Sequence, residues 1–163
     1  MRRHTNAPAA PGAQRGFTYL ALLFVVAILG VGLAATGVVW HTAAQREKEI
    51  ELLFVGAQFR RALASYYLFS PGAKRFPVEL ADLVKDPRLP GIKRHLRRLY
   101  PDPMTGKAEW GIVRNAEGGI IAVHSLSEQG PIRTYFPDDL HKSFNGKKRY
   151  ADWVFAYLPG MRL

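Results

Sequence analysis

An uncharged apolar block from Phe17 to Trp40 constrains this chain of 163 residues more than any other feature. Its length suits an α-helix that crosses a bilayer, at ~1.5 Å per residue against a hydrocarbon core of ~30 Å. An ordinary secretory signal has a shorter apolar stretch with the cut on its far side, and a cut near Ala43–Ala44 is the alternative of that kind. The block therefore predicts a membrane anchor that stays in the mature chain.

The charges on either side of this block predict its orientation. Arg2, Arg3 and Arg15 precede it, and no acidic residue occurs before Glu47. Basic residues beside a membrane helix stay on the cytoplasmic side. We therefore expect a cytoplasmic N-terminus, with the bulk of the chain across the membrane.

The whole chain is basic, with 23 Lys and Arg against 13 Asp and Glu. The excess is diffuse apart from Lys93, Arg94, Arg97 and Arg98, which we interpret as a solvated helix face, with anionic headgroups or an acidic partner as the alternative. No nucleic-acid motif accompanies the charge, so we expect no nucleic-acid partner. The chain has no cysteine, which excludes disulfides and thiolate metal sites.

Beyond the apolar block, the residue pattern predicts that the helix continues. From Gln45 to Phe69 there is no proline, and Gly56 is the single glycine. Apolar residues recur there at spacings of three and four, as on one face of a helix, at Leu52, Val55, Phe59, Ala62, Tyr66 and Phe69. Pro71-Gly72 ends the helix.

After this break the pattern predicts short elements. Two helical turns are expected over Val78–Lys85, and a hairpin pairs strands at Ala108–Arg114 and Gly119–Ser125. Gln129–Phe136 is a weaker strand or a loop, and Asp152–Leu158 is a closing strand. The predicted fold class is α+β: a long N-terminal, membrane-spanning α-helix packed on a small antiparallel β-sheet.

Four segments follow from these patterns. They are a disordered basic leader at 1–16, the transmembrane half of the helix at 17–40, its soluble half at 41–70, and a small globular domain with a sheet of three or four strands at 71–163.

The segment Arg15-Gly16-Phe17-Thr18-Tyr19-Leu20-Ala21-Leu22-Leu23 resembles the cleavage region of type IV prepilins and type II secretion pseudopilins. The segment Leu96–Gly106 and the strands after it resemble, more faintly, the globular layout of the major type II pseudopilin. The resemblance implies a pilin-like fold, cleavage after Gly16 by a prepilin peptidase, and N-methylation of Phe17. Glycine before the cut leaves the backbone open to the peptidase.

The resemblance also implies a structural role rather than an enzymatic one. The chain would be a single-pass protein of the bacterial inner membrane with a periplasmic C-terminal domain. Its partners would be the prepilin peptidase, other pseudopilin or pilin subunits, an inner-membrane assembly platform and the lipid bilayer. Small residues let membrane helices approach one another closely, and the block supplies them at Gly30, Gly32, Ala34, Ala35 and Gly37.

Ala21 departs from the family pattern. Family members usually carry glutamate as the fifth residue after the cut, where it is thought to attract the N-terminal amine of a neighbouring subunit. A carboxylate inside a bilayer costs ~2.5 kcal/mol or more, so it is kept for a reason. Its replacement indicates either a minor subunit at the fibre tip or an accessory relative. The alternative function is a single-pass, membrane-anchored periplasmic binding protein that does not polymerise.

The resemblance raises the question of calcium, because the major type II pseudopilin binds this ion in a late loop. Oxygen ligands suit calcium, and the candidates are Asp102, Asp138, Asp139 and Asp152. The spacing lacks the family's dense acidic loop, however, and basic residues crowd the region at Lys142, Lys147, Lys148 and Arg149. We therefore interpret the Asp-Asp pair as a solvated turn and expect no cofactor, with calcium as the alternative.

Motifs of known enzyme classes are lacking in this sequence: there is no Gly-x-Ser-x-Gly turn, phosphate loop or HExxH helix. Four histidines show no metal-ligand spacing and are expected at the surface or a strand edge, at His41, His95, His124 and His141. Ser125, Ser127 and Glu128 lie near His124 in sequence, but neighbouring strand residues point to opposite faces. We expect no enzyme, and an anchored hydrolase is a third hypothesis.

Overall fold

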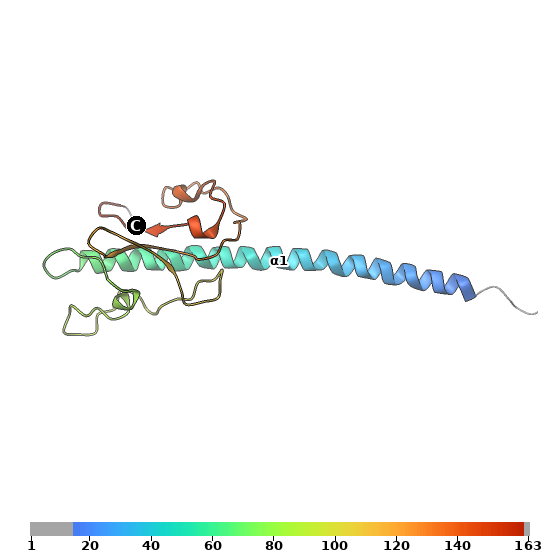
Figure 1. Ribbon diagram of the computed structural model, residues 1–163, viewed down its shortest axis with the longest axis horizontal. Helices are drawn as coiled ribbons and strands as arrows, with labels where there is room; N and C mark the ends of the chain where they lie inside the picture. Colours follow the sequence, from blue (N-terminus) through green and yellow to red (C-terminus); the bar gives the residue numbers. More distant parts are fainter. Residues whose placement is uncertain (1–14, 162–163) are drawn as a thin grey trace, which may run out of the picture. The chain divides into compact units, whose positions relative to one another are not determined.

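The computed structural model describes residues 15–161, and the side chains of 17–30 and 40–161. The predicted leader therefore lies outside the described residues, apart from Arg15 and Gly16. The chain divides after Ala43 into two units, each of which is described by itself. Helix α1 (Arg15–Leu68) belongs to both (Figure 1).

In the second unit, α1 buries one face, because apolar residues spaced three and four apart lie on the same side of a helix. The predicted stripe is confirmed at Leu52, Val55, Phe59, Ala62 and Tyr66, all at most 3% exposed. The prediction is wrong for Phe69, which is 62% exposed. The helix ends at Leu68, so Phe69 is not carried onto the buried face, and its ring lies 4.9 Å from the Lys93 ammonium.

The sheet has three strands in the order β1 (Gly111–Arg114), β2 (Ile120–His124) and β3 (Phe155–Ala156). Both pairings are antiparallel, and the α+β class is confirmed. The predicted hairpin forms between β1 and β2, and its turn places Gly118 at a φ of +80°, where a side chain would be strained. The register shifts between Val113 and Arg114, a bulge that the sequence did not indicate.

Two predicted elements differ in the structure. The short helix is a 3-10 turn, η1 (Leu80–Leu83). The Asp82 carboxylate accepts hydrogen bonds from the backbone N–H groups of Val78 and Glu79, each at 3.1 Å, and so fixes the chain just before this turn. The closing strand shrinks to β3, since η3 (Tyr150–Asp152) precedes it. Residues 129–136 are a loop, the second of the two predicted alternatives. A further 3-10 turn, η2 (Lys142–Phe144), lies between this loop and η3.

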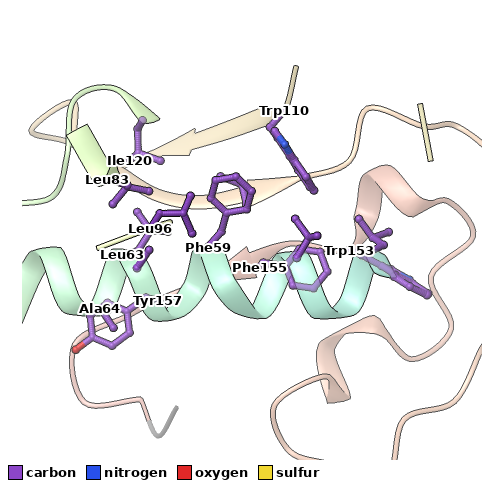
Figure 2. Close-up of a cluster of buried hydrophobic side chains, with 14 of the residues drawn as sticks. Phe59, Leu63, Ala64, Leu83, Leu96, Trp110, Ile120, Trp153, Phe155 and Tyr157 are labelled. Atoms are coloured by element: carbon purple, nitrogen blue, oxygen red, sulfur yellow. The ribbon is translucent and has the colours of Figure 1, made fainter. Parts of the chain in front are cut away.

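The core of this unit lies between α1, the sheet and the loops around them (Figure 2). Phe59 on the helix meets Trp110 edge to face, with ring centroids 5.1 Å apart. Trp153, fully buried, stacks on Phe144 at 5.4 Å. Phe155 of β3 lies directly over Gly56, whose missing side chain makes room for the ring. The helix and the sheet therefore share one aromatic-rich core.

A buried carboxylate joins the start of this unit to its last third. Glu49, 4% exposed, accepts bonds from the backbone N–H groups of Ile132 (2.6 Å) and Arg133 (3.2 Å) and from the Tyr150 hydroxyl (2.8 Å). Burial raises the pKa of Tyr150 to about 12, so the hydroxyl stays a donor. These bonds occupy the backbone N–H groups of Ile132 and Arg133, so these two groups are not available to pair a strand over 129–136 with a neighbour.

Candidate functional site

The first turns of α1 carry the predicted cleavage region. Arg15 and Gly16 begin the helix, and Phe17 is 78% exposed. Every large apolar side chain from 17 to 29 is at least 46% exposed, namely Phe17, Tyr19, Leu20, Leu22, Leu23, Phe24, Val25, Val26, Ile28 and Leu29. None of the residues that the structure describes in the first unit covers this segment, so its apolar surface is open to another partner.

Such a surface differs from that of an ordinary globular helix, which is apolar along one stripe and polar elsewhere. Here the apolar side chains occupy consecutive positions and thus all sides of the helix, and no Asp, Glu, Lys or Arg occurs between Arg15 and Arg46. Large exposed apolar surfaces mark contacts with protein or lipid. Among the residues that the structure describes, no helix is long and apolar enough to cross a membrane. Residues 31–39 of the predicted span have side chains outside that description.

The small residues of the assembly segment are described only in part. Ala21 is exposed, and no carboxylate lies near it in sequence. A Cβ added at Gly30 would meet no heavy atom within 4 Å, so this side of the helix is open to close approach. Gly32 and Gly37 lie among residues 31–39, outside the described side chains.

The calcium candidates have other partners. Asp152 bonds Arg149 at 2.8 Å, and this bond lowers the pKa of its carboxyl. Asp138 pairs with His141, and Asp139 is exposed. Asp102 is fully buried and accepts bonds from the Ser125 hydroxyl (2.8 Å), the Thr105 hydroxyl and the Met104 N–H. Within the described part of the chain, no three His, Asp or Glu side chains could hold a metal ion together.

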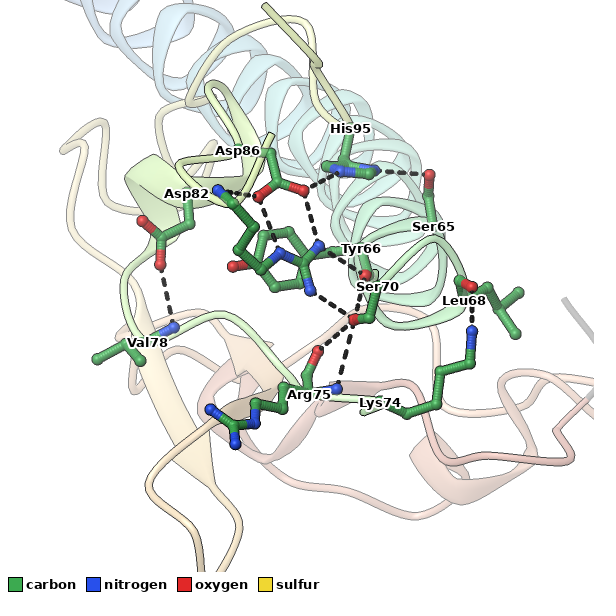
Figure 3. A network of polar contacts seen from close by, with 11 residues as sticks. Ser65, Tyr66, Leu68, Ser70, Lys74, Arg75, Val78, Asp82, Asp86 and His95 are labelled. Carbon is green, nitrogen blue, oxygen red and sulfur yellow. Dashed lines mark hydrogen bonds and ion pairs between the residues drawn. The ribbon is translucent and has the colours of Figure 1, made fainter. Parts of the chain in front are cut away.

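One polar cluster was not expected from the sequence (Figure 3). His95, predicted at the surface, has a fully buried side chain. Its Nδ1 lies 2.8 Å from the Ser65 hydroxyl, and its Nε2 lies 3.1 Å from Asp86. Asp86, also fully buried, bonds the Arg88 guanidinium at 2.7 and 2.8 Å. Hydrogen bonding from Arg88 holds the pKa of this carboxyl well below its usual range.

Serine, histidine and aspartate in one chain of contacts are the residue types of a nucleophilic triad, but the geometry here assigns them a structural task. Both carboxylate oxygens of Asp86 are bonded to Arg88, and both side chains of the His95–Asp86 pair are sealed from solvent. Arg88 continues to the Tyr66 carbonyl at 3.0 Å and to the Ser70 hydroxyl. The cluster therefore places a cation on a carbonyl of the last turn of α1, where the helix dipole favours positive charge.

The sequence carried no indication of this cluster, because Ser65, Asp86, Arg88 and His95 match no spacing motif. The other serines considered near His124 do not form a site. Ser125 points to Asp102, while the His124 ring contacts the Ser125 carbonyl at 2.9 Å.

Comparison with known proteins gave no match to this chain among protein-family models, curated proteins or solved structures. Function is therefore inferred from the exposed apolar segment, from the residues that begin α1, and from the folded unit that follows Ala43.

Proposed function

We propose that this chain is a pilin-like structural subunit, a minor pseudopilin of a type II secretion or type IV pilus-like assembly. The observation that carries the proposal is the apolar first part of α1, in which every large apolar side chain of residues 17–29 is open on all sides of the helix. A surface of this kind needs lipid or the helices of other subunits as cover. It begins one residue after Gly16, where a cut would place Phe17 at the new N-terminus.

The order of events follows from this surface. A single-pass position in the bacterial inner membrane covers the apolar segment with lipid, with the basic leader in the cytoplasm and the C-terminal domain in the periplasm. Prepilin peptidase then removes residues 1–16, and the Phe17 amine is methylated. An assembly platform transfers the helix from lipid to the helices of neighbouring pseudopilin subunits, which offer an equally apolar environment.

Ala21 favours a minor or terminal position in that fibre. A fibre-forming subunit with glutamate at this position offers its carboxylate to the amine of a neighbour, and Ala21 offers none. The same observation favours the second candidate, a membrane-anchored periplasmic accessory protein that does not polymerise. Both candidates keep the anchor and differ in whether the helix leaves the bilayer.

Processing after Gly16 is tested by mass spectrometry of the N-terminus, with the chain expressed in a bacterium that has a prepilin peptidase. We expect the wild-type chain to begin at a methylated Phe17 and the Gly16→Leu variant to keep its leader, because the larger side chain blocks backbone access. Gly12→Leu, a matched change inside the leader, is expected to be cut normally. An intact Met1 in the wild-type chain, or a start after Ala44, contradicts the proposal.

The assembly role is tested at position 21. Ala21→Glu is expected to be cleaved as the wild type is, because cleavage depends on Gly16. It is also expected to enter sheared fibres in a larger amount, because its carboxylate attracts a neighbouring amine in a medium of low dielectric. Immunoblots of the fibre fraction measure this amount, and Ala21→Gln is the uncharged control. Absence of the wild type and of both variants from the fibre fraction supports the accessory protein, and loss of cleavage contradicts the role assigned to position 21.

A further inference from the structure

The basic loop, residues 93–98, is held by its inward-facing residues. Leu96 is 3% exposed and the His95 side chain is fully buried. Their backbone N–H groups donate to the Leu83 carbonyl at 2.7 and 2.9 Å, and the Asp86 N–H donates to the Lys93 carbonyl at 3.0 Å. The sequence had suggested a helix face, but the loop is not helical. It is a fixed backbone from which Lys93, Arg94, Arg97 and Arg98 point outward.

Beside this loop lies the basic groove, a hollow of about 530 Å³. Its lining includes four cations, Lys85, Arg94, Arg97 and Arg98, and three apolar residues, Ala81, Val84 and Leu99. Leu99 is 42% exposed although it is large and apolar. We call the four cations the rim of the groove and the three apolar residues its floor.

The cations of the rim have no acidic partner of their own. Within the part of the chain that the structure describes, no carboxylate oxygen lies within 4.0 Å of the charged atoms of Lys85, Arg94, Arg97 or Arg98. The nearest acidic residues in sequence are engaged elsewhere. Asp86 is bonded to Arg88, and Asp82 accepts from the backbone before η1. Asp102 accepts from the Ser125 hydroxyl. The positive charge of the rim is therefore available to a partner.

We propose that the basic groove binds an acidic segment of a partner protein, with carboxylates on the arginines of the rim and an apolar side chain on the floor. Arginine suits this task because its planar guanidinium binds carboxylates at two points. A second copy of this chain does not fit, because the chain carries a formal charge of +10 and like charges repel. The inference is independent of the fibre role, since all its residues lie after Ala43.

An anionic lipid surface fits the groove less well. Attachment to a bilayer places apolar side chains beyond the cations, so that they enter the acyl region. In the basic groove, Val84 is half-buried and lines the hollow together with the cations instead. A hollow with an apolar floor matches one projecting side chain of a peptide.

The test uses the full chain in a non-ionic detergent and a fluorescent peptide rich in glutamate and aspartate that carries two leucines. We expect fluorescence anisotropy to show binding that weakens with added salt, as it does for exposed charges. Arg94→Glu/Arg97→Glu is expected to weaken it at least about tenfold, because carboxylates then face carboxylates. Lys147→Glu/Lys148→Glu changes the net charge equally at another exposed site and is expected to bind nearly as the wild type does. Arg94→Gln/Arg97→Gln, which adds no repulsion, is expected to lie between.

Three outcomes overturn the proposal. The first is an equal loss of binding in the two charge-reversal variants, which shows attraction to net charge alone. The second is equal binding of a peptide in which glycine replaces both leucines, which removes the role of the floor. The third is displacement of the peptide when phosphatidylglycerol, but not phosphatidylcholine, is mixed into the micelles, which assigns the groove to anionic lipid. Unchanged thermal unfolding of each variant shows that binding, and not folding, was altered.

Discussion

Replacing Asp86 with alanine is expected to lower the free energy of unfolding by about 3 kcal/mol, because it leaves a mostly buried cation without its partner. Arg88 has 20% of its side chain exposed, which places the effect at the lower end for a broken buried pair. His95 loses the acceptor at its Nε2 in the same change. Denaturant unfolding of the full chain, followed by tryptophan fluorescence, measures the loss.

Two further variants distinguish the coupling between Asp86 and Arg88 from the effect of removing a carboxylate elsewhere. Asp139→Ala removes an exposed carboxylate and is expected to change stability by less than about 0.5 kcal/mol. Arg88→Met combined with Asp86→Ala is expected to cost less than the sum of the two single changes, because no unpaired charge remains. An additive result contradicts the coupling of Asp86 and Arg88.

The same pair predicts a dependence on pH. Arg88 lowers the pKa of Asp86 in the folded chain, whereas an unfolded aspartate titrates near pH ~3.9. Because the pKa of Asp86 is lower in the folded chain than in the unfolded chain, its stabilisation is fully present above the pKa of the unfolded state. The stabilisation is lost as the pH falls toward the pKa of the folded state. The difference in stability between the wild type and Asp86→Ala is thus expected to be constant near neutral pH and to shrink below about pH 4. A difference that stays constant into strong acid contradicts the assigned cause.

A methyl group at Gly56 is expected to destabilise the domain by about 2 kcal/mol through overpacking. The new Cβ would lie 2.3 Å from two atoms of the Phe155 ring. The ring has little room to move, because Phe144 contacts it edge to face at 5.1 Å and the Arg60 guanidinium lies 5.9 Å from its centroid. Thermal unfolding monitored by circular dichroism measures the effect of Gly56→Ala.

Gly91→Ala is the matched control, because no atom lies within 4 Å of its added Cβ. It is expected to be neutral or slightly stabilising, since alanine restricts the unfolded chain. Phe155→Leu, placed together with Gly56→Ala, is expected to recover part of the loss by reducing the ring to a smaller side chain. If Gly56→Ala is as stable as the wild type, the packing of Phe155 on α1 is not as close as described.

The sequence predicted those elements whose residues repeat with a regular period. The buried stripe of α1 from Leu52 to Tyr66 and the hairpin of β1 and β2 both follow from local patterns. The prediction failed at Phe69, where the period continued for one residue beyond the end of the helix. The pattern left 129–136 open between a strand and a loop, and it is a loop in which the backbone N–H groups of Ile132 and Arg133 bond the distant Glu49. Periodicity identifies a face, but it does not show which distant group completes the hydrogen bonding.

The polar sites were harder to predict for the same reason. Ser65, Asp86 and His95 lie in different segments, and a network of this kind has no fixed spacing. The cluster of basic residues in the basic loop could be recognised from the sequence. The fully buried side chain of His95, which decides which residues of the loop point outward, could not. The residues of the cleavage region form one continuous stretch, so the motif at Gly16 could be proposed from sequence alone.

The bonds of Glu49 also determine how a mechanical load would enter the folded unit. Gln45, four positions earlier, donates to the Gly130 carbonyl at 2.9 Å and to the Tyr150 hydroxyl at 2.8 Å. Tension pulling on the chain from before Ala44 would reach these bonds and those of Glu49 first. These bonds link α1 to the loop at 130–133 and to Tyr150. They would be loaded in parallel, so they would share the force and would have to break together. The hydrophobic core would bear the force only after these hydrogen bonds had broken.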